Sequence, residues 1–358
     1  MYVKWVVFAL SLFVSSAAMA GDVTALYDAK VEMGNTTDQD DAAKQGLQQV
    51  LIKVSGNRDV LSQPLIRQNL ANATDFLLSY QFNIEQQKRI YNASYDQQKV
   101  DKLLRNANLP IWGKTRPATL LWLVEQPDET SFNRALISEQ SQSHIKDKVL
   151  QVAAERGLDM SFPLLDLDDL MNVSVYDVWG RFAAPVIQAS QRYNTDSLII
   201  GRIYQYKQQA EGLDDSLAQI KWRLDWRFIL GDSQFQGNVE DIEQDAVIQQ
   251  VIDTVADQLA SRYAIDAQSS AVSQWIELTV NNISGLEVYE NVRRFLNQLT
   301  AVADVTLSHI NGRKGTYKLR MIGTEQDLIN TLKLDSRMQR VVDQFGQPVA
   351  ELEFVWAP

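Results

Sequence analysis

The sequence predicts a multidomain protein of the α/β and α+β class, and three observations carry this prediction. With 358 residues, the chain is long enough for two or three domains. Between residues 117 and 265, apolar runs alternate with amphipathic helical patterns, which is typical of a sheet whose strands are joined through helices. From residue 275 to residue 356 the order is strand, helix, strand, strand, helix, strand. We therefore expect a central βαβαββα mixed sheet and a C-terminal ferredoxin-like βαββαβ module.

The segment before the central sheet, residues 21–116, is predicted as an α+β domain. Its longest helix has apolar side chains at helical spacing on one face, and Gly56 is placed to end it. The expected elements are a strand at 24–33, a helix at 39–54, helical structure between 64 and 78, strands at 80–84 and 88–95, and a helix at 97–106.

The central domain is expected to span residues 117–268. The expected elements are a strand at 119–124, a helix at 144–156, a strand at 161–165, helices at 168–171 and 175–193, strands at 197–206 and 219–230, and a helix at 244–263. The segment 126–140 is polar and contains Pro127, so we expect a loop there. Strands joined through helices imply parallel pairing, and the strand at 219–230 should close an antiparallel hairpin.

The C-terminal domain is expected at residues 269–358. Asn311-Gly312 has the composition of a hairpin turn, and Thr324 is placed to cap a helix. The expected elements are a strand at 275–280, a helix from 285 to 299, strands at 302–310 and 316–322, a helix from 324 to 332, and a strand at 349–356.

Residues 1–20 have the pattern of a secretory signal peptide. Lys4 precedes a short apolar run, and Ala18-Met19-Ala20 forms a small-residue cleavage site. Cleavage would remove one lysine and no acid, leaving 33 basic and 45 acidic residues and a net charge of −12. The pattern predicts a protein of a bacterial periplasm without a transmembrane segment after cleavage; an uncleaved N-terminal anchor is the alternative.

Composition excludes several kinds of function. The absence of cysteine excludes disulfides, thiolate metal sites, cysteine nucleophiles and a lipoprotein anchor, and two histidines leave little material for a histidine metal site. The formal charge of −11 argues against a nucleic-acid partner. No G-x-S-x-G motif or glycine-rich phosphate loop occurs in the sequence. We therefore expect no cofactor, no metal site and no identifiable catalytic residue.

Several separate strings carry a resemblance to a known family. They lie at residues 48–58, 108–117, 163–180 and 192–202, and they include Pro110-Ile111-Trp112-Gly113 and Asp177-Val178-Trp179-Gly180. Over roughly residues 22–265 the chain resembles secreted gammaproteobacterial proteins known as domain of unknown function 2066. The resemblance implies an envelope protein and assigns no catalytic residues. In organisation alone, the central domain is similar to α/β modules of the CsgG, TolB amino-terminal and LpoB type.

The best carboxylate cluster is formed by Asp166, Asp168 and Asp169 at the end of a predicted strand. Carboxylates at such an edge can hold Ca²⁺ or Mg²⁺, or act as a general acid and base. The spaced acids, turn glycine and distal glutamate of a calcium loop are absent, so helix capping is the favoured interpretation.

Two tryptophans and three arginines are further candidates for binding. Trp112 and Trp179 each precede a glycine at the end of an element, where we expect exposed contacts with a protein or a glycan. Arg202, Arg223 and Arg227 lie on the second face of their strands, where ion pairing is the simpler interpretation and an anion-binding or partner-binding strip is the alternative.

Together these patterns favour a periplasmic protein without enzymatic activity that binds other envelope proteins. Binding of peptidoglycan or another polysaccharide, or activation of a synthase, is the alternative. A carboxylate-based hydrolase is a third hypothesis, because two suitably placed acids are sufficient for glycosidic chemistry. Two converging acids in a cleft would favour the enzyme, and an exposed apolar groove or sheet edge would favour the binding protein.

Overall fold

The structure of the protein is a computed structural model. It describes residues 25–34, 36–85, 87–128, 133–208, 219–266, 274–350 and 352–357. The predicted signal peptide, residues 1–20, lies outside the described residues. No helix in the described part of the chain is long and apolar enough to cross a membrane.

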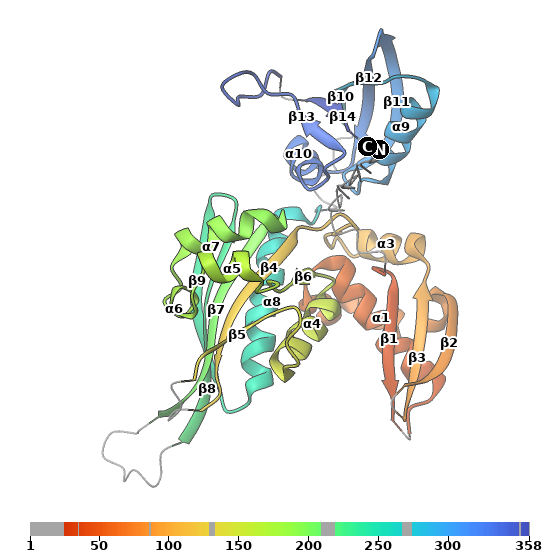
Figure 1. The fold of residues 1–358 in the computed structure, drawn as a ribbon. Helices are drawn as coiled ribbons and strands as arrows, with labels where there is room; N and C mark the ends of the chain where they lie inside the picture. Colours follow the sequence, from red (N-terminus) through yellow and green to blue (C-terminus); the bar gives the residue numbers. More distant parts are fainter. Residues whose placement is uncertain are drawn as a thin grey trace, which may run out of the picture.

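The fold is a mixed α/β architecture built on three sheets, as Figure 1 shows. Each sheet packs against its own helices, and one large cluster of buried apolar residues belongs to each. The central sheet has a further cluster on its second face. The predicted fold class is confirmed.

The N-terminal sheet has the strand order β1-β3-β2, with antiparallel pairing throughout. The helix α1 covers one face of β1 and β3, and Asp38 caps its first turn while Gly56, with a φ of 73°, ends it. The elements are β1 (Asp28–Met33), α1 (Gln39–Ser55), a 3₁₀ helix (Arg58–Ser62), α2 (Pro64–Leu70), a 3₁₀ helix (Ala73–Phe76), β2 (Leu77–Glu85), β3 (Lys88–Tyr95) and α3 (Gln97–Asn106).

The central sheet has the order β5-β4-β7-β8-β9, and β6 also pairs with β4. The pairs β4–β6 and β4–β7 are parallel, and β7–β8 is antiparallel, as predicted. The elements are β4 (Ala118–Gln126), β5 (Ala135–Ile137), α4 (His144–Arg156), β6 (Asp159–Ser161), α5 (Leu167–Asn172), α6 (Val175–Trp179), α7 (Ala183–Ser190), a 3₁₀ helix (Gln191–Tyr193), β7 (Ser197–Gln208), β8 (Gln219–Leu230), β9 (Ser233–Asp241) and α8 (Gln244–Tyr263).

Three details of the central sheet differ from the prediction. The expected loop at 126–140 contains the short strand β5, and the chain after β8 forms the edge strand β9. The strand expected at 161–165 is β6, which ends at Ser161, and Leu165 has a φ of 54° that no strand adopts. The chain therefore turns away from the sheet at the point where a longer buried strand was expected.

The C-terminal sheet has the order β11-β12-β10-β14-β13. The order β11-β12-β10-β14, with α9 and α10 between strands, is the ferredoxin-like order that the sequence predicts. Two details differ from that prediction: the additional short strand β13 precedes β14, and β14 therefore pairs parallel with β10, whereas the other pairs are antiparallel. Thr324 and Asp327 form a capping box at the start of α10. The elements are β10 (Trp275–Asn281), α9 (Leu286–Gln298), β11 (Val302–Asn311), β12 (Lys314–Met321), α10 (Glu325–Lys333), β13 (Met338–Arg340) and β14 (Glu353–Trp356).

Two buried arginines join the N-terminal part to the central sheet. Arg116 donates to the carbonyl oxygens of Lys53, at 2.6 Å, and of Gly157, at 3.1 Å. Arg156 donates to the carbonyl oxygen of Gly56 at 2.8 Å and pairs with Asp253 on α8. Because each guanidinium bonds to groups from both sides, the two parts are held in a fixed relation.

Candidate functional site

The two faces of the central sheet are covered differently (Figure 1). The helices α4 and α8 pack along one face, where β8 contributes Leu224, Trp226, Phe228 and Leu230 to the largest apolar cluster. The short helices α5, α6 and α7 cover the other face around Trp122 and Ile200. Further along β7 and β8 this second face carries polar and aromatic side chains, so it offers groups for binding.

The predicted residues Trp179, Arg202 and Arg223 meet on this second face. Arg202 donates to Asp225 at 2.7 Å, and Arg223 donates to the other oxygen of the same carboxylate at 2.9 Å. The guanidinium of Arg202 also lies 5.1 Å from the centre of the Trp179 ring, and that of Arg134 lies 3.7 Å from it. The partly exposed Trp179 ring is therefore packed against two guanidinium groups, which compete with a sugar for its faces.

Asp225 organises this group, which we call the arginine–tryptophan site: Arg134, Trp179, Arg181, Arg202, Tyr204, Arg223, Asp225 and Arg227. The side chain of Asp225 is 2% exposed. Burial by itself would raise the pKa of Asp225, but the hydrogen bonds from Arg223 and Arg202 outweigh burial and hold that pKa below its ordinary value. Asp225 is thus a buried carboxylate that fixes the arginines in place.

Arginines outnumber carboxylates at this site. Arg181 follows α6 with a φ of 55°, and its backbone N–H donates to the carbonyl oxygen of Val178 at 3.0 Å, whereas its guanidinium makes no hydrogen bond or ion pair with any described residue. Burial lowers the pKa of Arg181. The negative charge of Asp225 raises this pKa, and the positive charges of Arg202 and Arg227 lower it further. Among the described residues, the Arg227 guanidinium donates one hydrogen bond, to the side-chain oxygen of Gln236 at 3.5 Å. The site is therefore locally positive on a chain of net charge −11.

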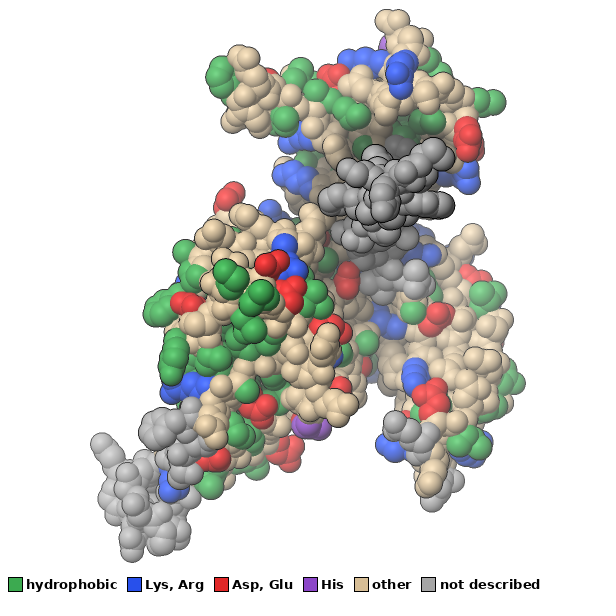
Figure 2. Space-filling model, viewed as in Figure 1, with side chains coloured by type: hydrophobic (Ala, Val, Ile, Leu, Met, Phe, Trp, Pro, Cys, Tyr) green, Lys and Arg blue, Asp and Glu red, His purple; other side chains and the backbone are tan. Residues whose placement is uncertain are grey.

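Beside the arginine–tryptophan site, α5, α6 and α7 expose a continuous apolar surface (Figure 2). We call it the α5–α7 surface, and its side chains are between 38% and 76% exposed: Leu164, Leu167, Leu170, Met171, Tyr176, Phe182 and Ile187. Contacts between α5 and α7 and between α6 and α7 hold these residues together. Contiguous exposed apolar surfaces of this kind mark sites of contact with other macromolecules.

The predicted aspartates border the α5–α7 surface, and two of them stabilise the local fold through capping and ion pairing. Asp166 caps α5 and forms a two-pronged ion pair with Arg192, with distances of 2.6 and 2.7 Å. Hydrogen bonds from Arg192 lower the pKa of Asp166 to about 2. Asp169 is buried and accepts from the backbone of Leu165 at 2.9 Å and from the Tyr193 hydroxyl. Asp168 is exposed and 3.8 Å from Arg192. No acidic or histidine group suited to a metal occurs among the described residues.

Trp112 lies away from the other candidates and is a correction to the sequence analysis. Its side chain is 1% exposed, so the expected surface contact is wrong. The ring packs in the central apolar cluster with the Arg116 guanidinium 3.9 Å from its centre. Trp112 lies where the N-terminal part meets the central sheet, and its large ring fills the space between these two parts.

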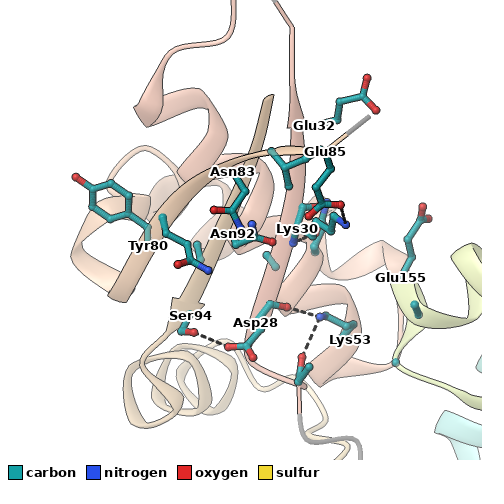
Figure 3. A pocket seen from close by; sticks show the side chains of 18 of the residues that line it. Asp28, Lys30, Glu32, Lys53, Tyr80, Asn83, Glu85, Asn92, Ser94 and Glu155 are labelled. Atoms are coloured by element: carbon teal, nitrogen blue, oxygen red, sulfur yellow. Dashed lines mark hydrogen bonds and ion pairs between the residues drawn. The ribbon is translucent and has the colours of Figure 1, made fainter. Parts of the chain in front are cut away.

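A polar cleft of about 1030 Å³ lies between the N-terminal sheet and α4 (Figures 2 and 3). Lys30 on β1 pairs with Glu85 on β2 at 2.6 Å, and Ser94 donates to Asp28 at 2.6 Å. Lys53 is buried at the inner end and donates to the backbone oxygens of Ala25, at 3.2 Å, and Asp28. Burial lowers the pKa of Lys53 to about 8.

The free binding groups of this cleft are neutral. Gln81, Asn83 and Asn92 line it, and their side chains make no hydrogen bond within the described ranges. Glu32 is paired with Lys88 as Glu85 is with Lys30, and the Asp28 carboxylate accepts from Ser94. Such amides can exchange hydrogen bonds with hydroxyl or peptide groups. The sequence analysis missed this cleft, although polar residues alternate with apolar ones along residues 77–85.

Comparison with solved structures gives only a remote likeness. The crystal structure of protein XCC0632 from Xanthomonas campestris, assigned to the family DUF330, is 9% identical in sequence and aligns with a TM-score of 0.18. The alignment covers 42% of this chain and 84% of that one. A score this low carries no argument about fold or function. None of the curated proteins compared with this sequence matches it.

Two family models match separate parts of the chain. Residues 20–113 match a domain of unknown function, DUF8605, and residues 274–349 match DUF2066. The DUF2066 match confirms the family that the sequence resembles. Its location differs from the prediction: the strings that carried the resemblance lie at residues 48–202, whereas the family model matches residues 274–349. The first two strings fall mainly in the DUF8605 range, and the other two fall in neither range. The C-terminal sheet thus lies in the part of the chain that matches DUF2066, and the N-terminal sheet in the part that matches DUF8605.

Proposed function

We propose that this protein is a binding protein of the bacterial periplasm that contacts other envelope proteins through the α5–α7 surface. The observation that carries the proposal is the exposure of leucine, methionine and aromatic side chains on three adjacent short helices. Exposing so much apolar surface to water is unfavourable unless a partner covers it. The signal-peptide pattern of residues 1–20 supports the periplasmic location.

The neighbouring arginine–tryptophan site supports a protein partner. Aromatic and arginine side chains are enriched at the centres of protein interfaces. Arg181 and Arg202 lie beside the apolar surface and would meet acidic groups of the partner. The expected contact has an apolar centre with a positive border.

The test is cross-linking in cells, followed by affinity purification and mass spectrometry. The variant combines Leu167→Ser with Met171→Ser, because both side chains are more than 70% exposed and contribute little to the core. The matched control is Leu286→Ser, an equally exposed leucine at the start of α9. We expect one partner with the native chain and with the control, and its loss with the double variant.

A partner that persists with the double variant would contradict the proposed surface, as would the absence of any partner from cells that contain abundant folded protein. The location has its own test, because intact mass analysis of the periplasmic fraction should show a chain that begins at Gly21. A chain that begins at Met1 would contradict signal cleavage.

A second candidate function is binding of peptidoglycan or another polysaccharide in the polar cleft. The row of unpartnered amides at Gln81, Asn83 and Asn92 favours it, because sugar hydroxyl groups can replace their hydrogen bonds to water. Sedimentation with purified peptidoglycan should be weakened by Asn83→Ala together with Asn92→Ala. The control is Asn238→Ala, an exposed amide on β9. Equal sedimentation of both variants would remove this candidate.

A further inference from the structure

The strand β2 forms an open edge of the N-terminal sheet. It pairs with β3 on one side, and no strand among the described residues pairs with its other side. Every residue from Leu78 to Glu85 is exposed. The edge is therefore a nine-residue strand with unsatisfied backbone hydrogen-bonding groups along its length.

From Leu78 to Glu85 the side chains of β2 alternate between apolar and polar. The apolar side chains of Leu78, Tyr80, Phe82 and Ile84 lie on the face that α1 covers further in, and they remain between 45% and 78% exposed. Ser79, Gln81 and Asn83 lie on the opposite face, toward the cleft of Figure 3. Tyr80 and Phe82 contact each other and the ring of Tyr91, with ring centres 5.4 to 5.8 Å apart. An aromatic cluster thus continues from the core to the open edge.

From Ser79 to Glu85 the strand lacks the features that keep natural edge strands from pairing, and its one register shift against β3 lies at its start, between Leu77 and Ser79. It contains no proline, no lysine and a single charged residue, Glu85, at its end. Proteins usually protect long edge strands with such residues, with bulges or with a covering segment. An edge left open over this length is suited to the addition of another strand.

The strand is also complementary to itself. In an antiparallel pair of two copies centred on Gln81, the midpoint of Leu77–Glu85, Tyr80 lies opposite Phe82 and Leu78 lies opposite Ile84. On the other side of the sheet Ser79 then faces Asn83 and Gln81 faces its own copy, while Leu77 faces Glu85 at the two ends. The two Glu85 carboxylates lie at opposite ends of the pair, so no like charges meet. A shift by one residue would place apolar side chains opposite polar ones.

We infer that two copies of this chain pair through β2, antiparallel about a two-fold axis at Gln81, and form one six-stranded sheet. The pairing satisfies the open backbone groups and covers the apolar side chains of both copies. It uses a surface separate from the α5–α7 surface, so it neither requires nor excludes the partner proposed above.

The absence of cysteine in the native chain allows a direct test. In the variant Gln81→Cys, the two introduced thiols face each other across the axis and should form a disulfide-linked dimer on mild oxidation. The matched control is Gln234→Cys, an exposed glutamine on the edge strand β9, which should stay monomeric in a denaturing gel. The native chain should have the mass of a dimer in light scattering.

A second variant tests the pairing without an introduced cross-link. Gln81→Lys places two positive charges opposite each other, which should raise the dissociation constant by about tenfold or more. Gln234→Lys should leave the dimer unchanged. Far-UV circular dichroism confirms that the variants fold. A monomeric native chain at 100 μM, a dimer that Gln81→Lys leaves intact, or a dimer that Gln81→Cys does not cross-link would each overturn the inference.

Discussion

The two faces of the central sheet differ in what their side chains do. Against α4 and α8, the strands present leucine, isoleucine and phenylalanine, and the helices are long enough to bury them. Against α5–α7, the helices are five to eight residues long, and much of their own apolar surface stays in water. The first face is almost fully buried, whereas the second leaves apolar and positive groups exposed.

The difference follows from helix length. A long amphipathic helix can bury one complete face and leave only polar groups outside. A helix of one or two turns cannot cover a whole strand, so Arg202, Tyr204 and Arg223 on the sheet stay beyond its reach. Short helices on one face of a sheet thus leave room for a site that longer helices would cover.

The largest expected effect is at the fully covered face. Phe228 is 0% exposed and stacks on Phe235, so Phe228→Ala should lower the free energy of unfolding by about 3–5 kcal/mol. Urea unfolding followed by tryptophan fluorescence measures this loss. A loss below about 1 kcal/mol would mean that this face is not the rigid core described above.

On the second face, the strongest effect should come from the buried carboxylate. Asp225→Ala leaves Arg202 and Arg223 without their shared partner and should cost about 3 kcal/mol, the low end for breaking a buried pair because both arginines are partly exposed. Glu240→Ala, which breaks the more exposed pair with Arg223, should cost less than about 1 kcal/mol. Equal losses in these urea titrations would remove the special role of Asp225.

The free energy of unfolding should also depend on pH through the Asp225 carboxylate. Because the pKa of Asp225 is lower in the folded state than its unfolded value of about 3.9, its stabilising contribution is complete above that value. It is lost as the pH falls through the folded pKa. The free energy of unfolding of the native chain should therefore fall more steeply below about pH 4 than that of Asp225→Asn. Parallel slopes for the two proteins would contradict the lowered pKa.

The smallest effect on stability should come from the α5–α7 surface. Leu170→Ser changes a side chain that is 59% exposed and should alter the free energy of unfolding by less than about 0.5 kcal/mol. The same variant should lose a partner captured by cross-linking. A large loss of stability would show that Leu170 packs in the core. The difference in burial between the two faces of the sheet would then not hold at this position.

Elements with strong one-sided periodicity are predictable from the sequence. The helices at 97–106 and 244–263 have the predicted bounds, because apolar side chains recur at helical spacing and clear caps or turns bound them. β9 was missed because its inward side carries only Phe235, Gly237 and Val239, and the ring of Trp226 occupies the space at Gly237. When few large apolar side chains lie on the inward side of a strand, the alternation of apolar and polar residues that identifies a strand becomes weak.

The candidate site was predictable only in part. Alternation placed Arg223 and Arg227 on one face of their strand, and Asp225 between them was visible in the same pattern. Its role as the shared partner of Arg202 depends on the register of β7 against β8, which pairs these two residues across the strands. Trp112 and Trp179 look alike in sequence, each before a glycine, yet one is buried at a junction and the other is half-exposed beside arginines.

The fold class, the ferredoxin-like order of the strands near the C-terminus and the residue types on each face of β8 could be predicted from the sequence, because periodicity and capping are local properties of the chain. Which side chains are exposed could be learned only from the folded molecule. Exposure depends on how far each helix extends over its sheet and on which strand lies at an edge, and both are set by packing between segments distant in sequence. The α5–α7 surface and the open edge of β2 are therefore visible only in the folded molecule.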